Sequence, residues 1–210
     1  MGSLRLTDEG RSGPVDWAVA ARALPGEPLS GDAHVVVSDA DQVTLAVIDG
    51  LGHGPIAAQA ADIAVQTIRG LPGERIEVIL ERCHQALSKS RGAAITCLQV
   101  GLVDGSATWL GVGNVDAWIL RRDVVGTLAR ESALPAGGVV GLQMPALRPR
   151  SVRLRGGDVI IMVTDGVAPS WIEAVRPGRP PAATARHILD DHCRPGDDAL
   201  VLAARYRGVR

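Results

Sequence analysis

The chain has 210 residues and a formal net charge of -1 at pH 7, with 46% hydrophobic and 2% aromatic residues. This length fits one domain, whose core must be filled by Val, Leu, Ile and Ala because the chain contains no Phe. Nucleic-acid binders use positive charge and base stacking, and acidic membranes attract basic proteins, so the composition favours neither partner. We therefore expect small molecules or other proteins as partners.

Cysteine usage and hydropathy predict a cytoplasmic protein. The three cysteines, Cys83, Cys97 and Cys193, are odd in number and widely spaced, which fits free thiols better than a disulfide framework. No stretch approaches the length of a membrane span, and the N-terminus lacks the apolar segment of a signal peptide. No feature of the sequence indicates an oligomer, so a monomer is expected.

The N-terminal part of the chain predicts a lead-in followed by β-structure. Residues 1–14 are polar and contain glycine, which predicts a flexible lead-in to a single domain over residues 15–210. Three β-rich runs predict strands over residues 17–24, 33–38 and 43–48. The polar segment 39–42 predicts a hairpin turn between the last two strands, which would bring Asp32 and Asp49 to the same end.

Helices and a second group of strands follow. Apolar residues at helical spacing predict helices over residues 55–69 and 74–90. After Gly92 the period changes to two, which predicts an antiparallel meander with strands 93–103, 107–112, 117–122 and 124–130. The remaining expected elements are strands over 150–155, 159–164 and 199–206, a helix beginning within 167–174, and a helix over 182–192.

Acidic residues stand at the ends of the most apolar strands. Asp49 and Asp165 each follow such a strand and precede a glycine, whereas Asp197 precedes the last strand. Taken singly, such an acid is more often a turn residue or a helix cap than a metal ligand. Carboxylates that meet at one edge of a sheet repel one another, and Mg²⁺ or Mn²⁺ would offset this repulsion because both prefer oxygen ligands. A divalent-metal site and ordinary turns thus stay open as alternatives.

Four segments, in this order along the chain, resemble a known motif series. They are Ser30-Gly-Asp32, Asp49-Gly-Leu-Gly-His-Gly54, Thr164-Asp-Gly-Val167 and Gly196-Asp-Asp-Ala-Leu-Val201. The series is similar to that of the PPM-type, metal-dependent Ser/Thr protein phosphatases, in particular the SpoIIE-like branch and its RsbX-like stressosome phosphatases. The resemblance spans about residues 17 to 206 and implies an α+β fold, a four-layer αββα sandwich of two antiparallel sheets flanked by helices.

The resemblance also implies roles for single residues. Asp49 would bridge two Mn²⁺ or Mg²⁺ ions, and the carbonyl of Gly50 would bind one of them. Asp165 and Asp197 would complete the shell of the other ion, and Asp32 would bind through water. The implied catalytic residues are therefore Asp49, Asp165 and Asp197, at one end of the sandwich between the two sheets.

The positions around these acids depart in part from the family pattern. Distant eukaryotic members place a candidate general-acid histidine two residues after the bridging aspartate, whereas His53 follows Asp49 by four. We therefore expect His53, like Asp198, to support the metal ligands from behind rather than donate a proton. No arginine is assigned as a phosphate clamp, because Arg22, the nearest candidate, is expected to face solvent.

The sequence thus predicts a Mn²⁺- or Mg²⁺-dependent phosphoserine/phosphothreonine phosphatase. By resemblance, its partners would be phosphorylated STAS-domain proteins of an RsbR/RsbS-like, stressosome-like complex, and it would act as a negative regulator of a stress response. Two alternatives stay open: a non-catalytic phosphatase-like module that binds a partner, and a phosphohydrolase acting on small molecules. The motifs indicate that a phosphate group is bound, but they do not indicate whether a protein or a small molecule carries it.

Overall fold

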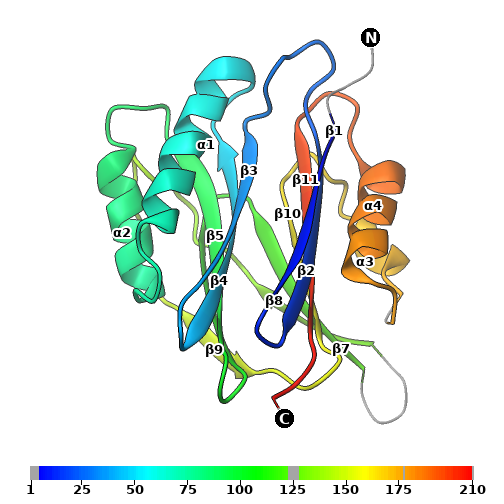
Figure 1. Cartoon of the computed structure of the whole chain (residues 1–210). Coiled ribbons are helices and arrows are strands. Elements are labelled where there is room, and N and C mark those ends of the chain that lie inside the picture. The colour runs from blue at the N-terminus through cyan, green and yellow to red at the C-terminus, as the bar shows by residue number, and fades with distance from the viewer. Residues whose placement is uncertain (1–4, 123–127, 177, 210) are drawn as a thin grey trace.

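Two stacked antiparallel sheets, with helices on both outer faces, form the protein (Figure 1). The computed structural model describes residues 5–122, 128–176 and 178–209. One sheet has six strands in the order β1-β2-β11-β10-β7-β8, and the other has five in the order β3-β4-β5-β6-β9. This arrangement confirms the four-layer αββα sandwich that the motifs imply.

Most strands lie on the expected β-rich runs, and β1 is an addition to them. The six-stranded sheet contains β1 (Arg5–Ser12), β2 (Val15–Arg22), β7 (Asp116–Arg122), β8 (Leu128–Ala133), β10 (Val159–Val163) and β11 (Ala199–Tyr206). The five-stranded sheet contains β3 (Asp32–Ser38), β4 (Gln42–Gly50), β5 (Ala93–Gly101), β6 (Ser106–Val112) and β9 (Arg150–Arg153). The strand predicted over residues 124–130 falls partly on residues 123–127, which lie outside the described part of the chain.

The helices cover the outer faces in two pairs. The five-stranded sheet packs against α1 (Gly54–Arg69) and α2 (Ile76–Ala86), whose apolar faces carry Ala, Val and Ile. The six-stranded sheet packs against α3 (Trp171–Ala174) and α4 (Pro181–His192). Among the described residues, no helix is long and apolar enough to cross a membrane.

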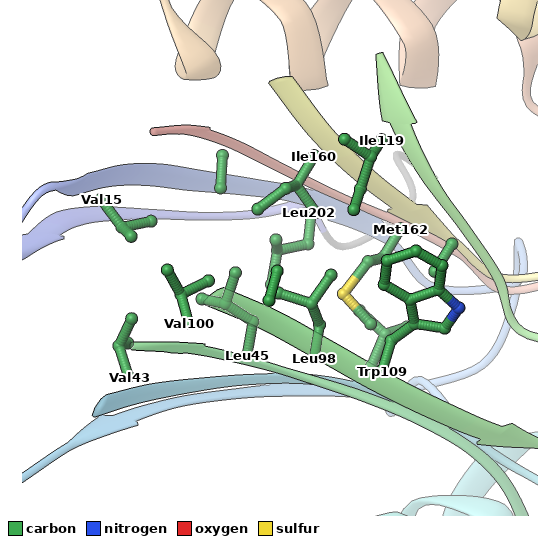
Figure 2. Packing of buried hydrophobic residues seen from close by; sticks show 14 of the residues in the cluster. Val15, Val43, Leu45, Leu98, Val100, Trp109, Ile119, Ile160, Met162 and Leu202 are labelled. Atoms are coloured by element: carbon green, nitrogen blue, oxygen red, sulfur yellow. The ribbon is translucent and has the colours of Figure 1, made fainter. Parts of the chain in front are cut away.

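The largest core lies between the two sheets (Figure 2). Leu45, Leu98 and Val100 of the five-stranded sheet face Ile160 and Leu202 of the other sheet across this layer. All five side chains are buried, so aliphatic packing stands in for the missing Phe. This packing fixes the separation of the two sheets, and the acidic residues lie at the ends of their strands.

The prediction of a flexible lead-in is wrong for most of its length. Residues 5 to 12 form β1, an edge strand that pairs with β2 along its whole length, from Arg5↔Arg22 to Ser12↔Val15. Most residues of β1 are polar, and the strand has only one large apolar residue, Leu6. An edge strand tolerates this composition because it is more exposed than a central strand, so its sequence lacks the hydrophobic pattern of a buried strand. The domain therefore includes this segment.

The prediction of a single meander after Gly92 is also wrong. β5 and β6 pair in the five-stranded sheet, whereas β7 and β8 pair in the six-stranded sheet. The chain crosses between the sheets at Gly113-Asn114, where Gly113 has φ 106° and so adopts a conformation that favours glycine. The alternation of apolar and polar residues is the same in β5–β6 and in β7–β8, so it does not reveal that the chain changes sheets between them.

Candidate functional site

The first two acids face each other across a hairpin. Asp32 begins β3 and Asp49 lies near the end of β4, and the two residues are direct partners in the antiparallel register. β4 continues one residue beyond Asp49, and the backbone N–H of Gly50 donates to the carbonyl of Gly31 at 3.0 Å. The hairpin predicted from the sequence thus places both carboxylates at one end of the five-stranded sheet.

The other two acids lie at the same end of the six-stranded sheet. Asp165 follows β10 and Asp197 precedes β11, and these strands are antiparallel neighbours. The turn at Gly166 is tight, since a Cβ atom there would lie 1.7 Å from the carbonyl oxygen of Asp198. Only glycine fits at this position, which explains the Asp-Gly pair of the motif.

A hydrogen bond joins the two acid pairs across the sandwich. The hydroxyl of Thr164 donates to Oδ2 of Asp32 at 2.7 Å and accepts from the backbone N–H of Leu200 at 2.9 Å. Asp32 begins β3 of one sheet, whereas Leu200 lies in β11 of the other sheet and Thr164 directly follows its strand β10. Thr164 therefore fixes the position of one acidic pair relative to the other.

Asp198 is buried and holds a loop. Its Oδ1 accepts from the backbone N–H of Leu24, and its Oδ2 accepts from that of Gly31, both at 2.7 Å. The residue is only 4% exposed, so both of its oxygens are used inside the protein. Asp198 thus anchors the loop that leads to Asp32, in agreement with the expected supporting role.

The four remaining carboxylates form a repulsive cluster. Burial raises the pKa of Asp49 to about 7, and the charges of Asp165, Asp197 and Asp198 add to this shift. Burial and the charge of Asp49 also raise the pKa of Asp32 well above its ordinary value. Burial and Asp165 raise the pKa of Asp197 in the same way. Each shift means that the folded protein disfavours the charged carboxylates unless a cation accompanies them.

Asn114 is a member of this site that the sequence alone did not single out as functional. Its amide Nδ2 donates to Oδ2 of Asp165 at 2.7 Å. A hydrogen bond from the same side chain lowers the pKa of Asp49 against the larger opposing effects. The Gly113-Asn114 pair marks only a turn in the sequence, and the crossing between sheets is what brings Asn114 to the acids.

The side chains of His53 and Arg22 contact groups other than the four acids. His53 caps α1, is 63% exposed at its side chain, and its Nδ1 lies 2.8 Å from Oε1 of Glu27. The guanidinium of Arg22 donates to the carbonyl of Arg194 at 2.7 Å. Arg22 thus holds the loop before Asp197. From the sequence we expected it to face solvent, and the structure shows it only partly exposed.

The donor set suits hard divalent cations. Asp32, Asp49, Asp165 and Asp197 offer carboxylate oxygens, the chemistry that Mg²⁺ and Mn²⁺ prefer. The raised pKa values of Asp32, Asp49 and Asp197 show unbalanced negative charge. In the part of the chain that the structure describes, no three His, Cys, Asp or Glu side chains converge tightly enough to form a ready metal cage. The residues therefore fit an open site whose carboxylates would draw together around the ions.

The family follows from a match over most of the domain. The model of the Stage II sporulation protein E (SpoIIE) family matches residues 39–207, which include Asp49, Asp165 and Asp197. The chain belongs to the SpoIIE family. Its sequence is 28% identical to the phosphoserine phosphatase RsbX of Bacillus subtilis (strain 168) over 144 residues, which are 68% of this chain and 69% of RsbX.

Solved structures of the SpoIIE family and of PP2C phosphatases share the fold. A structure of RsbX in complex with magnesium superposes with a TM-score of 0.84 at 21% identity and covers 95% of this chain and 99% of RsbX. A chain described under "The bacterial stressosome: a modular system that has been adapted to control secondary messenger signaling" gives a TM-score of 0.79 at 28% identity over 91% of this chain and 99% of that one. The serine/threonine phosphatase PstP of Mycobacterium tuberculosis gives 0.72 at 14% identity, covering 92% of this SpoIIE-family chain and 99% of PstP.

Proposed function

We propose that this protein is a metal-dependent phosphoserine/phosphothreonine protein phosphatase. The observation that carries the proposal is that Asp32, Asp49, Asp165 and Asp197 lie at the same end of the two sheets. Burial and neighbouring carboxylates raise the pKa of three of them, Asp32, Asp49 and Asp197. Membership of the SpoIIE family and the 28% identity to a phosphoserine phosphatase support it. The reaction would transfer the phosphoryl group to water and release the hydroxyl side chain and inorganic phosphate.

Two Mn²⁺ or Mg²⁺ ions would occupy the site. Asp49 would hold both ions, with the Gly50 carbonyl on one of them, Asp165 and Asp197 on the other, and Asp32 acting through water. Bound there, the ions would supply a water of lowered pKa and neutralise the charge of the phosphoryl oxygens. RsbX, a relative of this chain, has been solved in complex with magnesium.

The protein's own residues orient this site. Asn114 would keep the carboxylate of Asp165 turned toward the ions, because it donates to one of its oxygens and leaves the other free. Thr164 and Asp198 would do the same for Asp32, the first by a direct hydrogen bond and the second through the loop ending at Gly31. Glu27 holds His53, so His53 would support the start of α1 rather than donate a proton.

The substrates would be phosphorylated STAS-domain proteins of a stressosome-like complex in the cytoplasm, where the enzyme would act as a negative regulator of a stress response. The similarity to RsbX, and to a chain from a structure of the bacterial stressosome, supports this assignment. The scarcity of aromatic residues and the near-zero net charge agree with a protein substrate rather than a nucleic acid.

The test is the release of phosphate from a phosphorylated STAS protein with Mn²⁺ present. Asp49→Asn and Asp165→Asn are expected to lower the rate at least 100-fold, whereas Asp62→Asn, at an exposed position of α1, should leave it unchanged. Full activity of either site variant in a metal chelator would contradict the proposal. A wild-type protein that binds the STAS protein and Mn²⁺ but releases no phosphate would support the non-catalytic alternative instead. Release from small phosphate esters alone would identify a small-molecule phosphohydrolase.

A further inference from the structure

A cavity with charged side chains in its wall lies far from the acidic cluster, at the opposite end of the six-stranded sheet. Its volume is about 470 Å³, and Arg121, Arg155, Gly156, Gly157, Asp158 and Arg205 are among the residues that line it. Asp158 precedes β10 and Arg205 lies in β11, the two strands whose other ends carry Asp165 and Asp197. Asp158 and Asp165 are seven positions apart along nearly extended chain, so the two sites are roughly 20 Å apart. We call this feature the arginine cavity.

The one carboxylate of the arginine cavity is already neutralised. Asp158 is 3% exposed, and its Oδ2 accepts from Nη2 of Arg121 at 2.8 Å and from the backbone N–H of Arg155 at 2.9 Å. Nε of Arg121 lies 3.2 Å from Oδ1 of the same carboxylate, so the pair is bidentate. Asp158 therefore does not screen the charges of Arg155 and Arg205, because it is already paired with Arg121.

Arg155 and Arg205 leave the arginine cavity with unbalanced positive charge. Arg205 gives one guanidinium N–H group to the carbonyl of Arg179, which leaves its other donors available. The guanidinium of Arg155 has no hydrogen-bond or ion-pair partner among the described residues, and the residue is exposed. Two guanidinium groups with free N–H donors in the wall of the arginine cavity are suited to bind an anion, because the planar guanidinium group can donate two parallel hydrogen bonds to phosphate oxygens.

The backbone around the arginine cavity is held in place before any ligand arrives. The N–H of Gly157 donates to the carbonyl of Tyr206 at 2.7 Å, and the N–H of Tyr206 donates to the carbonyl of Asp158 at 2.9 Å. Gly157 has φ 97° and no atom within 4 Å of the position that a Cβ would take, so this turn borders open space. A fixed wall lowers the ordering cost of binding.

We propose that the arginine cavity binds a small phosphate compound, of the pyrophosphate or nucleoside-diphosphate class, through Arg155 and Arg205. Its volume falls in the range of small-molecule sites. No aromatic side chain lies among its described lining residues, so the phosphate charge and not base stacking provides the recognition. The site is separate from the acidic cluster, and the inference does not depend on phosphatase activity.

Calorimetric titration with pyrophosphate tests the proposal. The protein carries Asp49→Asn and the buffer contains a metal chelator, so that the acidic cluster cannot hold a phosphate through metal ions. Saturable binding with one site per chain is expected, and the double substitution Arg155→Ala and Arg205→Ala should weaken it at least tenfold. The matched control is Arg153→Ala: Arg153 is 75% exposed, lies 3.9 Å from Asp104, and does not line the cavity.

Three results would overturn the proposal: no saturable binding, equal loss in the Arg153→Ala control, or equal affinity for sulfate and pyrophosphate. Arg155→Ala alone serves as a second variant, because Arg205 also contacts Arg179 and its loss could disturb the loop before α4. Arg121 is left intact, because its removal would leave Asp158 buried and unpaired. A titration with ADP in parallel identifies the source of the phosphate, and tighter binding of ADP than of pyrophosphate would assign the site to a nucleotide.

Discussion

Two neighbouring aspartates of the last motif, Asp197 and Asp198, have different structural roles. Asp197 and Asp198 are adjacent, yet Asp198 uses both oxygens for backbone N–H groups, whereas Asp197 accepts from the N–H of Asp198 through Oδ1 only and keeps Oδ2 available. The carboxylates available for cations are thus those that the protein leaves partly unsatisfied. The consequence is that the site destabilises the metal-free protein.

Asp49→Asn is therefore expected to stabilise the protein in a metal chelator. The folded-state pKa of Asp49 is raised from 3.8 to about 7, so stability falls as the pH rises through this interval, and the penalty is complete above pH 7. The gain should be roughly 1–4 kcal/mol at pH 8, or several degrees in Tm, and should vanish below pH 4. Thermal unfolding followed by circular dichroism measures it.

The same variant should respond differently to metal ions. Mn²⁺ should raise the Tm of the wild-type protein, since a ligand that binds only the folded state stabilises it, and should have little effect on Asp49→Asn. Asp62→Asn, with its exposed carboxylate on α1, is the control and should behave as the wild type in both conditions. An Asp49→Asn variant that is less stable than the wild type in chelator at pH 8 would show that the cluster is not repulsive.

At the scale of elements, the glycines of the motifs do not share one reason for being glycine. A Cβ at Gly50 would lie 2.2 Å from the carbonyl oxygen of Ala57, and one at Gly166 would lie 1.7 Å from that of Asp198, so both positions are closed to side chains. Gly196 has no atom within 4 Å of such a Cβ. The strand ends at Gly50 and Gly166 are therefore close-packed, whereas the turn at Gly196 is open.

Gly166→Ala is expected to destabilise the protein by at least about 2 kcal/mol, because the backbone of β10 or β11 must shift to admit the methyl group. Gly196→Ala, in the same group of motifs, should change stability by less than about 1 kcal/mol. Urea unfolding of both variants measures the difference. Equal effects would mean that the close approach at Gly166 does not restrict this position.

Much of the element pattern could be predicted, because buried strands and amphipathic helices carry clear periodicity. α1 begins one residue before its expected range and ends where expected, and β4 begins one residue earlier and ends two residues later than expected. The acids were also predictable, since Asp49 and Asp165 end strongly apolar runs. Asn114 and Thr164 were not assigned roles, because both act through partners in another strand or sheet that sequence spacing does not reveal. β1 was missed because an edge strand does not need an apolar face.

At the scale of the whole molecule, two of the three thiols are sealed between the five-stranded sheet and its helices. Cys83 of α2 and Cys97 of β5 are both 0% exposed and belong to the same core cluster. Burial raises the pKa of Cys83 to about 12 and raises that of Cys97 as well. Cys193 is partly exposed. Cys193 therefore reports on the surface of the protein, and Cys83 and Cys97 report on its packed interior.

Iodoacetamide at pH 8.5 is expected to modify Cys193 alone in the folded protein, because alkylation requires an accessible thiolate. Cys83 and Cys97 should react only in denaturant and with a common midpoint, since they share one packed layer. Mass spectrometry of peptides after timed labelling gives the three rates. Rapid labelling of Cys97 in the absence of denaturant would show that this layer opens without global unfolding.

The hydrogen bond between Thr164 and Asp32 has a consequence for how the protein loses function. It joins residues of different sheets, and the four acids are divided equally between those sheets. The distances within the acidic cluster therefore depend on how the two sheets are aligned, which is set by this hydrogen bond and by aliphatic packing between the sheets. Aliphatic side chains slide past one another more easily than hydrogen-bonded strands do. A slip of one sheet against the other by about one ångström would disperse the acids while every strand kept its hydrogen bonds. Inactivation of this protein can thus precede any loss of secondary structure.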